Sequence, residues 1–175
     1  VENPSFARGD TVRGAVDWSR RQQLSIHHTA IHVISGAARR VLGRHVWQAG
    51  AQKSEHKAHI DITHHKQLSA AEIEEIEALA NTVVRKGFRI RKEVLPRHEA
   101  EKRYGMTIYQ GGAIPEKELR INAIVDQRGA VFDVEACSGT HLESTNPIGT
   151  IVVGSTDRIQ DGIVRLTIVA GDAAT

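Results

Sequence analysis

The sequence has little cysteine and no long apolar run, and each of these absences excludes a class of protein. A single cysteine among 175 residues excludes a disulfide framework and favours a reducing, cytoplasmic compartment. No apolar run approaches the roughly 20 residues that would cross a bilayer, and the N-terminus has no apolar signal core. We therefore expect a cytoplasmic protein without a membrane partner.

Aromatic residues and net charge are also low. Aromatic residues make up 4% of the chain, so a core would consist mainly of aliphatic side chains. The net charge of +2 is too small to indicate a nucleic-acid partner by itself, although it allows a local basic surface. The apolar content of 40% and the charged content of 25% are ordinary for a globular protein. The length suits one domain with its own core.

Two helices are predicted by apolar residues that recur at helical spacing. The first begins after Asp17, a favourable N-cap residue, and ends near Leu42. The second covers residues 69–87, where Ser69 and Glu72 have the spacing of a capping box. Both helices have one apolar face, so both are expected to pack against a sheet.

Strands are predicted where apolar and polar residues alternate between turn residues. One is expected at residues 11–16, and a short helix is expected to start at Pro96. The other strands cover residues 45–52, 57–63, 88–95, 118–126 and 130–136, and a last hairpin covers residues 149–171. Hairpins dominate, which predicts the α+β class, with a mostly antiparallel sheet packed with the long first helix and the second helix.

Two pairs of residues with the same spacing are candidates for a metal site. His28 and His32 lie four residues apart in the first helix, and Cys137 and His141 lie four residues apart after a predicted strand. Residues at this spacing share a helix face, and mixed nitrogen and sulfur donors favour zinc over hard cations. Taken separately, each pair is more typical of ordinary core packing, so the spacing alone shows only that a zinc site is possible.

The order of several motifs adds a family resemblance. The segments HHTAIH, VWQAGAQ, YQGG, VEACSGTH and RIQDGIVRL follow one another along the chain. In this order and spacing, residues 12–171 resemble the editing domain of alanyl-tRNA synthetases and of their free-standing AlaX relatives. The segment VWQAGAQKSEHKAHIDITHHKQLS is most similar to the archaeal-type branch. The second additional domain of threonyl-tRNA synthetases is similar in its two metal-binding motifs.

The resemblance implies both a cofactor and an activity. It implies a zinc ion held by His28, His32, Cys137 and His141. It also implies a deacylase that removes serine and glycine from the 3′-terminal ester of mischarged tRNA(Ala), with the acceptor end of that tRNA as the partner. In a full-length alanine–tRNA ligase, ATP would serve only a ligase domain that lies outside this chain.

The resemblance also assigns residues to the substrate pocket. Gln48 lies where the family has a glutamine that lines the pocket and can donate to the ester or orient water without titrating. Gly111 and Gly112 match a glycine pair that lets the backbone approach the terminal adenosine. Ala51 is expected to bind substrate beside them.

Thr29 and Ile31 are the remaining predicted catalytic residues. Members of the family that are part of a synthetase usually have a threonine where this chain has Ile31, near the seryl hydroxyl. Because isoleucine cannot form a hydrogen bond, we expect Ile31→Thr to raise the ratio of seryl to alanyl ester hydrolysis. An unchanged ratio would place the selectivity at Thr29 or Gln48.

Two other functions stay open at this point. One is threonyl-type editing, which removes serine from tRNA(Thr), and the other is a non-catalytic tRNA-binding module that zinc stabilises. Residues 1–17 are expected to end a preceding glycine-rich barrel region or linker, and residues 18–175 to form the zinc-dependent editing domain. A homo-oligomer would form through regions outside this chain.

The other histidines are assigned no metal. His27 neighbours a predicted ligand but points about 100° away from it on the helix. His56, His59, His64 and His65 lie on a predicted strand and a turn, where histidines are mostly polar surface groups.

Overall fold

The structure is a computed structural model, and it describes residues 6–174. Within these residues the helices are α1 (Trp18–Leu42), α2 (Ala70–Lys86) and α3 (Arg97–Tyr104). The strands are β1 (Gln48–Lys53), β2 (Ala58–Thr63), β3 (Arg89–Pro96), β4 (Glu118–Val125), β5 (Val131–Ala136), β6 (Ile151–Gln160) and β7 (Ile163–Ala170). Short 3-10 turns cover Met106–Ile108, Asn146–Ile148 and Gly171–Ala174.

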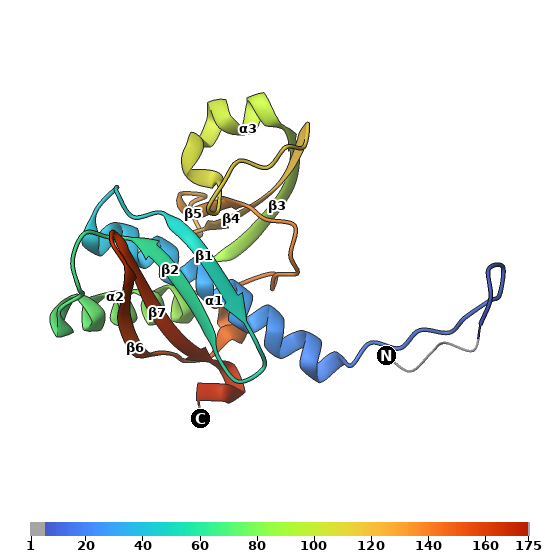
Figure 1. The fold of residues 1–175 in the computed structure, drawn as a ribbon, viewed down its shortest axis with the longest axis horizontal. Coiled ribbons are helices and arrows are strands. Elements are labelled where there is room, and N and C mark those ends of the chain that lie inside the picture. The colour runs from blue at the N-terminus through green and yellow to red at the C-terminus, as the bar shows by residue number, and fades with distance from the viewer. Residues whose placement is uncertain (1–5, 175) are drawn as a thin grey trace.

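The strands form two antiparallel sheets. The larger sheet has the order β1-β2-β7-β6, and the smaller one has the order β3-β4-β5. Figure 1 shows α1 passing between the two sheets, with α3 at the far side of the smaller sheet. The prediction of an antiparallel α+β fold with two packed helices is confirmed. The division of the strands into two sheets is a feature that the alternation pattern did not reveal.

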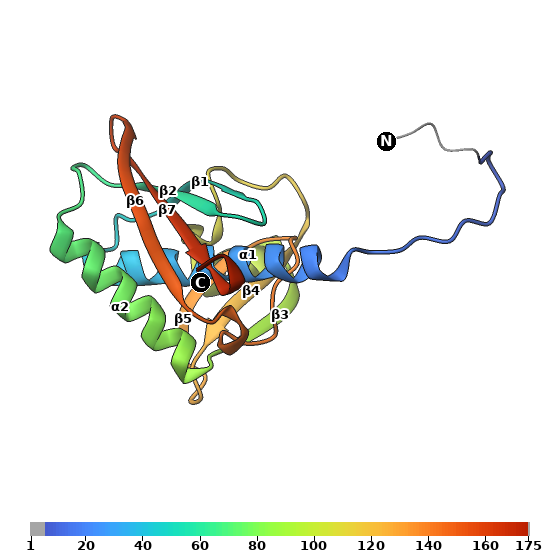
Figure 2. The same cartoon turned by 90° about the horizontal axis from the view of Figure 1, so that it is seen from below.

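The helix α1 forms the centre of the molecule. Asp17 caps it by accepting a hydrogen bond from the backbone N–H of Arg20 at 3.0 Å, and Gly43 follows its last residue. It packs against α2, β2 and β5, and Figure 2 shows α2 crossing beside it under the larger sheet. Every residue from 25 to 38 is therefore buried, and polar side chains in this stretch need partners inside the protein.

The helix α2, the predicted strands at residues 118–126 and 130–136, and the predicted hairpin at residues 149–171 also agree with the sequence patterns. Ser69 and Glu72 form the predicted capping box, and Gly87 ends α2 in the left-handed conformation at φ 63°. β4 and β5 pair as a hairpin, and so do β6 and β7, with Gly162 at φ 73° in the turn between them. These elements are determined by capping and turn residues within a few positions of each other, so they can be predicted from the sequence.

The apolar side chains gather in two clusters. The larger one surrounds α1 and includes Ile31, Ile34, Ile60 and Leu166, and the smaller one lies between β3–β5, α3 and the segment that follows α3. Almost all of these side chains are aliphatic, as the low aromatic content predicted. None of the helices that the structure describes combines the length and the apolar composition needed to cross a bilayer.

The predicted strand at residues 11–16 is wrong. These residues are exposed and pair with no strand in the described chain, and Figure 1 shows them extending away from the start of α1. Alternation alone cannot form a strand without a neighbouring edge to pair with. The assignment of residues 1–17 to a preceding barrel region or linker stays a prediction, and residues 1–5 lie outside the described residues.

Candidate metal centre

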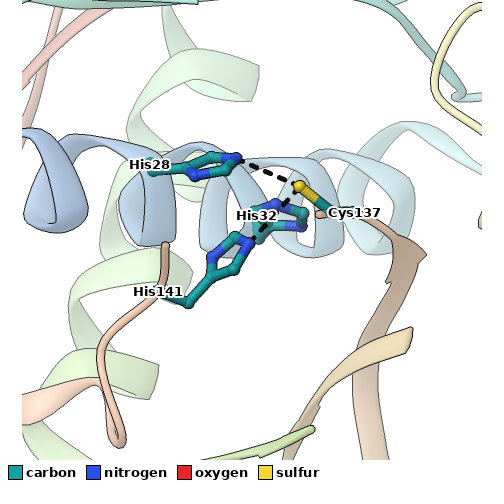
Figure 3. A group of neighbouring side chains, drawn as sticks. All are labelled: His28, His32, Cys137 and His141. Carbon is teal, nitrogen blue, oxygen red and sulfur yellow. Dashed lines mark hydrogen bonds between the residues drawn. The ribbon is translucent and has the colours of Figure 1, made fainter. Parts of the chain in front are cut away.

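Both predicted pairs of ligands meet at one point of the structure. His28 and His32 project from the same face of α1, and Cys137 and His141 come from the segment after β5 (Figure 3). Cys137 Sγ lies 3.3 Å from His28 Nε2 and 3.4 Å from His141 Nε2. One ligand atom from each of the four residues lies within 4.8 Å of the others. The predicted convergence is therefore observed.

The donor set and its spacing fit a tetrahedral metal ion. A sulfur and a nitrogen bound to one zinc ion are about 3.6 Å apart at ordinary bond lengths, close to the two distances measured from Cys137 Sγ. His32 Nε2 is buried and has no hydrogen-bond partner among the described residues. A buried imidazole nitrogen without a partner is costly, and a metal ion between the four side chains would remove that cost.

The local electrostatics favour the thiolate that metal binding requires. Burial raises the pKa of Cys137, but its hydrogen bonding with His141 and His28, together with the nearby imidazole of His32, outweighs burial and lowers that pKa to about 3. Burial lowers the pKa of His141 to about 4, and it also lowers the pKa of His28. Neutral imidazoles and a thiolate are the protonation states that bind a divalent cation.

The segment from Cys137 to His141 can approach α1 only because Gly139 has no side chain. A Cβ on Gly139 would lie 2.1 Å from the ring of His28. His28 Nδ1 lies 3.2 Å from the carbonyl oxygen of Thr140, so the protonated Nδ1 donates there and Nε2 faces Cys137. The sequence Cys-Ser-Gly-Thr-His thus contains both a ligand pair and the hydrogen bond that orients a third ligand.

Thr29 links the same segment to the helix. Its hydroxyl donates to the carbonyl oxygen of Ser25 at 2.8 Å and accepts from the backbone N–H of Leu142 at 3.1 Å. Ile31 is 1% exposed and belongs to the larger apolar cluster. The structure therefore places Thr29 and Ile31 in the packing around the ligands, and their catalytic roles stay predictions.

Two carboxylates lie behind His32 and were not identified from the sequence. His32 Nδ1 is 3.3 Å from Glu135 Oε2 and 3.7 Å from Asp133 Oδ2, and both carboxylates are almost fully buried. Burial lowers the pKa of His32, but Glu135 and Asp133 outweigh it and raise that pKa. Because Nδ1 is the nitrogen that faces the carboxylates, the proton on Nδ1 is held there, and Nε2 is the nitrogen that faces the other three side chains. A metal ion at Nε2 would take the place of the second proton that the raised pKa favours. A signal was present, because Asp133 and Glu135 alternate along β5 and so share one face, and the same alternation continues to Cys137 directly after the strand.

Other side chains hold these carboxylates in place. Arg39 Nη1 pairs with Asp133 at 3.0 Å, and Ser35 Oγ donates to Glu135 at 3.0 Å. Gln110 also donates from Nε2 to Glu135. Because Gln110 directly precedes the predicted glycine pair, this bond connects the substrate-pocket segment to the metal ligand His32.

The predicted pocket residues Gln48, Gly111 and Gly112 line a single cavity of about 370 Å³. Its apolar walls include Trp47 and Tyr109, and the Trp47 indole donates to the Tyr109 carbonyl oxygen at 3.0 Å. Gln48 is 5% exposed, and its Oε1 has no hydrogen-bond partner in the described chain. The geometry thus leaves one acceptor of Gln48 free at a cavity of ligand size.

Gly111 lines this cavity, whereas Ala51 does not. Gly111 has φ +79°, and a Cβ there would lie 2.5 Å from the carbonyl oxygen of Ala49, so only glycine fits. Ala51 is exposed on β1, opposite Ile60 in the ladder, and is not among the residues that line the cavity. Its role in substrate binding stays a prediction.

A second cavity, of about 360 Å³, lies at the metal ligands themselves. His141, Gly139 and Thr140 form one side of it, and the basic residues Lys92 and Arg120 form part of the other. Glu93 and Asn122 also line this cavity, and Lys92 is paired with Glu143, so its wall carries both charges beside His141.

His27 shows what a buried histidine without a metal looks like. It is 0% exposed, its Nδ1 donates to the Ser54 carbonyl oxygen at 2.7 Å, and its Nε2 accepts from the Ala170 N–H at 3.2 Å. Both nitrogens are satisfied by the backbone, so His27 is a packing residue. His32 differs, because its buried Nε2 has no hydrogen-bond partner among the described residues.

Comparison with known proteins assigns the class of this fold and site. Residues 116–167 match the family described as the threonyl and alanyl tRNA synthetase second additional domain. The matched segment includes β4, β5, Cys137 and His141, whereas the ligands on α1 lie outside it. The α+β fold with its two antiparallel sheets therefore belongs to the second additional domains of these synthetases.

Relatives over the whole chain define the branch. The chain is 51% identical to the alanine–tRNA ligase of Pyrococcus furiosus over 175 residues, which is 99% of the chain and 19% of that ligase. It is 50% identical to the alanine–tRNA ligase of Aeropyrum pernix over 164 residues, or 94% of the chain and 18% of that ligase. The chain thus spans about a fifth of the length of these archaeal relatives, and it is an editing-type domain of the alanyl-tRNA synthetase family.

Proposed function

We propose that this domain is a zinc-dependent deacylase that removes serine and glycine from the 3′-terminal ester of mischarged tRNA(Ala). The observation that carries the proposal is the convergence of His28, His32, Cys137 and His141 on one point. The cavity that Gln48 lines supports it, as does the similarity to alanine–tRNA ligases. The acceptor end of tRNA(Ala) is the proposed partner.

The physical need for such an activity follows from the size of the amino acids. A pocket that accepts alanine cannot exclude glycine by size, and it rejects an analogue with an added hydroxyl only about 100-fold. Hydrolysis of the wrong ester at a second site supplies the missing discrimination. A serine or glycine ester is therefore the expected substrate of a domain similar to alanine–tRNA ligases.

The four ligands would hold zinc, because three imidazoles with one thiolate form a borderline-soft donor set. Such an ion supplies Lewis-acid polarisation of the ester or an anchor for the substrate amino group. Gln48 would position the ester or the attacking water through its free amide, which does not titrate. Gly111 would let the terminal nucleoside approach the backbone closely.

Mischarged tRNAs test this proposal directly. We expect the domain to release serine from Ser-tRNA(Ala) and glycine from Gly-tRNA(Ala) faster than alanine from Ala-tRNA(Ala). Cys137→Ala should lose both zinc and activity. Gln48→Ala should keep zinc but lower kcat by about 100-fold, whereas Gln52→Ala, on the exposed part of the same strand, should retain both.

The same assay separates the other two functions. Release of serine from tRNA(Thr) but not from tRNA(Ala) would identify threonyl-type editing instead. Binding of tRNA(Ala) without release of any amino acid would identify a non-catalytic module, in which zinc only stabilises the fold. Either result would overturn the proposal.

Selectivity between serine and alanine is tested at Ile31. We expect Ile31→Thr to raise the ratio of seryl to alanyl ester hydrolysis, because a hydroxyl beside the ligands could bond to the seryl side chain. The ratio is measured on both esters of tRNA(Ala), with the zinc content determined in parallel. An unchanged ratio at full zinc content would place the selectivity at Thr29 or Gln48.

A further inference from the structure

A second group of histidines lies away from the centre on α1. His45 is in the connection from α1 to β1, and His64 and His65 directly follow β2. His45 Nε2 lies 2.9 Å from His64 Nδ1, and one ring nitrogen of each of the three residues lies within 4.8 Å of the others. His64 is 3% exposed, which corrects the expectation that it is a polar surface group, whereas His45 and His65 are exposed.

We propose that His45, His64 and His65 bind a second divalent metal ion of the zinc, cobalt or nickel type. Imidazole nitrogens suit these ions, and two nitrogens on one tetrahedral zinc are about 3.3 Å apart. The separation of 2.9 Å between His45 Nε2 and His64 Nδ1 is close to this value. Three protein ligands leave one coordination position for water.

A hydrogen bond between His45 and His64 explains only part of the cluster. The ring of His65 lies 4.7 Å from the ring of His64 and 5.7 Å from that of His45, between centroids. No hydrogen bond explains why a third imidazole gathers there. A metal ion would replace the single proton that the first two rings share, and it would bring all three nitrogens to a common partner.

His64 is prepared for ligation by its surroundings. Its backbone N–H donates to the Gly162 carbonyl oxygen at 2.9 Å, which fixes it against the turn between β6 and β7. Burial lowers the pKa of His64, and the neighbouring His65 and His45 lower it further. The nearby ammonium of Lys66 is paired with Glu72 at 3.1 Å, which reduces its repulsion of a cation.

The proposed ion would stabilise one wall of the cavity that Gln48 lines. Thr63 Oγ1 donates to the His45 carbonyl oxygen at 2.6 Å and accepts from the Trp47 N–H at 2.8 Å. Trp47 and Thr63 both line the cavity of about 370 Å³. A metal bound to His45 and His64 would therefore fasten the connection before β1 to the end of β2, directly beside this wall.

Metal stoichiometry tests the site independently of any deacylase activity. After saturation with Zn²⁺ and gel filtration in metal-free buffer, we expect two zinc ions per chain in the unsubstituted protein. His65→Asn should hold one, because it removes an exposed ligand without disturbing the core. The matched control His56→Asn changes another exposed histidine, in the turn between β1 and β2, and should keep two.

Cobalt distinguishes the two sites from each other. The centre with Cys137 should show thiolate-to-Co²⁺ charge transfer, whereas the second equivalent of Co²⁺ should add none, since all its protein ligands are imidazoles. His65→Asn should keep the charge-transfer band and lose the second equivalent. The proposal is overturned if the unsubstituted protein and His65→Asn each bind only one ion per chain. It is also overturned if His65→Asn retains the second ion, which would then be an adventitious ion only.

Discussion

The imidazole of His32 has one nitrogen toward a carboxylate and the other toward the metal centre. Its Nδ1 lies 3.3 Å from Glu135 Oε2, and its Nε2 has no partner in the described chain. A carboxylate in this position fixes the tautomer and the orientation of a ligand and raises its basicity. At the scale of single residues, the centre therefore depends on Glu135 as well as on the ligands.

Glu135→Gln is expected to weaken zinc binding by about 10–100-fold. The amide keeps the shape of the side chain but removes the negative charge that favours the Nδ1–H tautomer of His32. Competition with a chelator of known affinity measures the change. Glu118→Gln makes the same substitution at an exposed position of the neighbouring strand β4 and should leave the affinity unchanged. Equal affinities in the two variants would exclude this role of Glu135.

Gly139→Ala is expected to abolish the centre through a single methyl group. The added Cβ would lie 2.1 Å from the His28 ring, so the segment from Cys137 to His141 must move away from α1. Zinc content after gel filtration should fall by one ion per chain. Gly154→Ala is the control, because a Cβ there would lie 3.8 Å from its nearest neighbour. Full zinc content in Gly139→Ala would show that the loop adapts without cost.

At the scale of elements, the capping box at the start of α2 contributes to the stability of the fold. Glu72 Oε2 accepts from the backbone N–H of Ser69 at 2.8 Å, and the Ser69 hydroxyl accepts from the Glu72 N–H at 3.3 Å. The backbone and hydroxyl bonds from Ser69, and then Lys66, lower the pKa of Glu72 to about 2. A capping carboxylate with a lowered pKa stabilises the fold only while it is ionised.

Glu72→Gln should therefore destabilise the protein at neutral pH and have less effect in acid. The folded-state pKa of about 2 lies below the ordinary glutamate pKa of 4.5, so the contribution is complete above pH 4.5 and is lost as the pH falls toward 2. Denaturant unfolding at a series of pH values measures the difference from the unsubstituted protein. Glu74→Gln, an exposed position of the same helix, should show no such trend. A pH-independent difference would contradict the capping explanation.

At the scale of the whole molecule, the centre joins parts that are distant in sequence. His28 and Cys137 are 109 residues apart, and their elements, α1 and β5, lie in different layers (Figure 1). The two sheets pack on α1 through separate apolar clusters. A metal ion at the centre would therefore link the smaller sheet, through the segment after β5, to α1.

Removal of the metal is expected to lower the stability of the whole domain. At a free zinc concentration 100 times the dissociation constant, binding contributes about 2.7 kcal/mol, which corresponds to a fall of roughly 5–10 °C in Tm after chelation. Calorimetry of His65→Asn with and without chelator measures this for the Cys137 centre alone. The double variant with Cys137→Ala should show no response. An equal fall in Tm after chelation in the single and the double variant would mean that the ion is bound elsewhere.

The sequence alone predicted what local geometry decides. Helix bounds, the capping box of Ser69 and Glu72 and the hairpin turn at Gly162 follow from interactions within a few residues, and all are observed. The spacing of His28 and His32 also predicted that they share a face. The ordered motifs predicted the family, which the comparisons confirm. The strand at residues 11–16 failed because no neighbouring edge is available to it.

Only the tertiary structure decided which side chains meet. Packing buries all faces of α1 between residues 25 and 38, so His27 becomes a satisfied core residue while His28 faces Cys137. It also places Glu135 behind His32. It brings His45, in the connection from α1 to β1, into contact with His64, which follows β2. These contacts depend on the relative positions of separate elements, which the burial of apolar surface over the whole chain determines and no short stretch of sequence specifies.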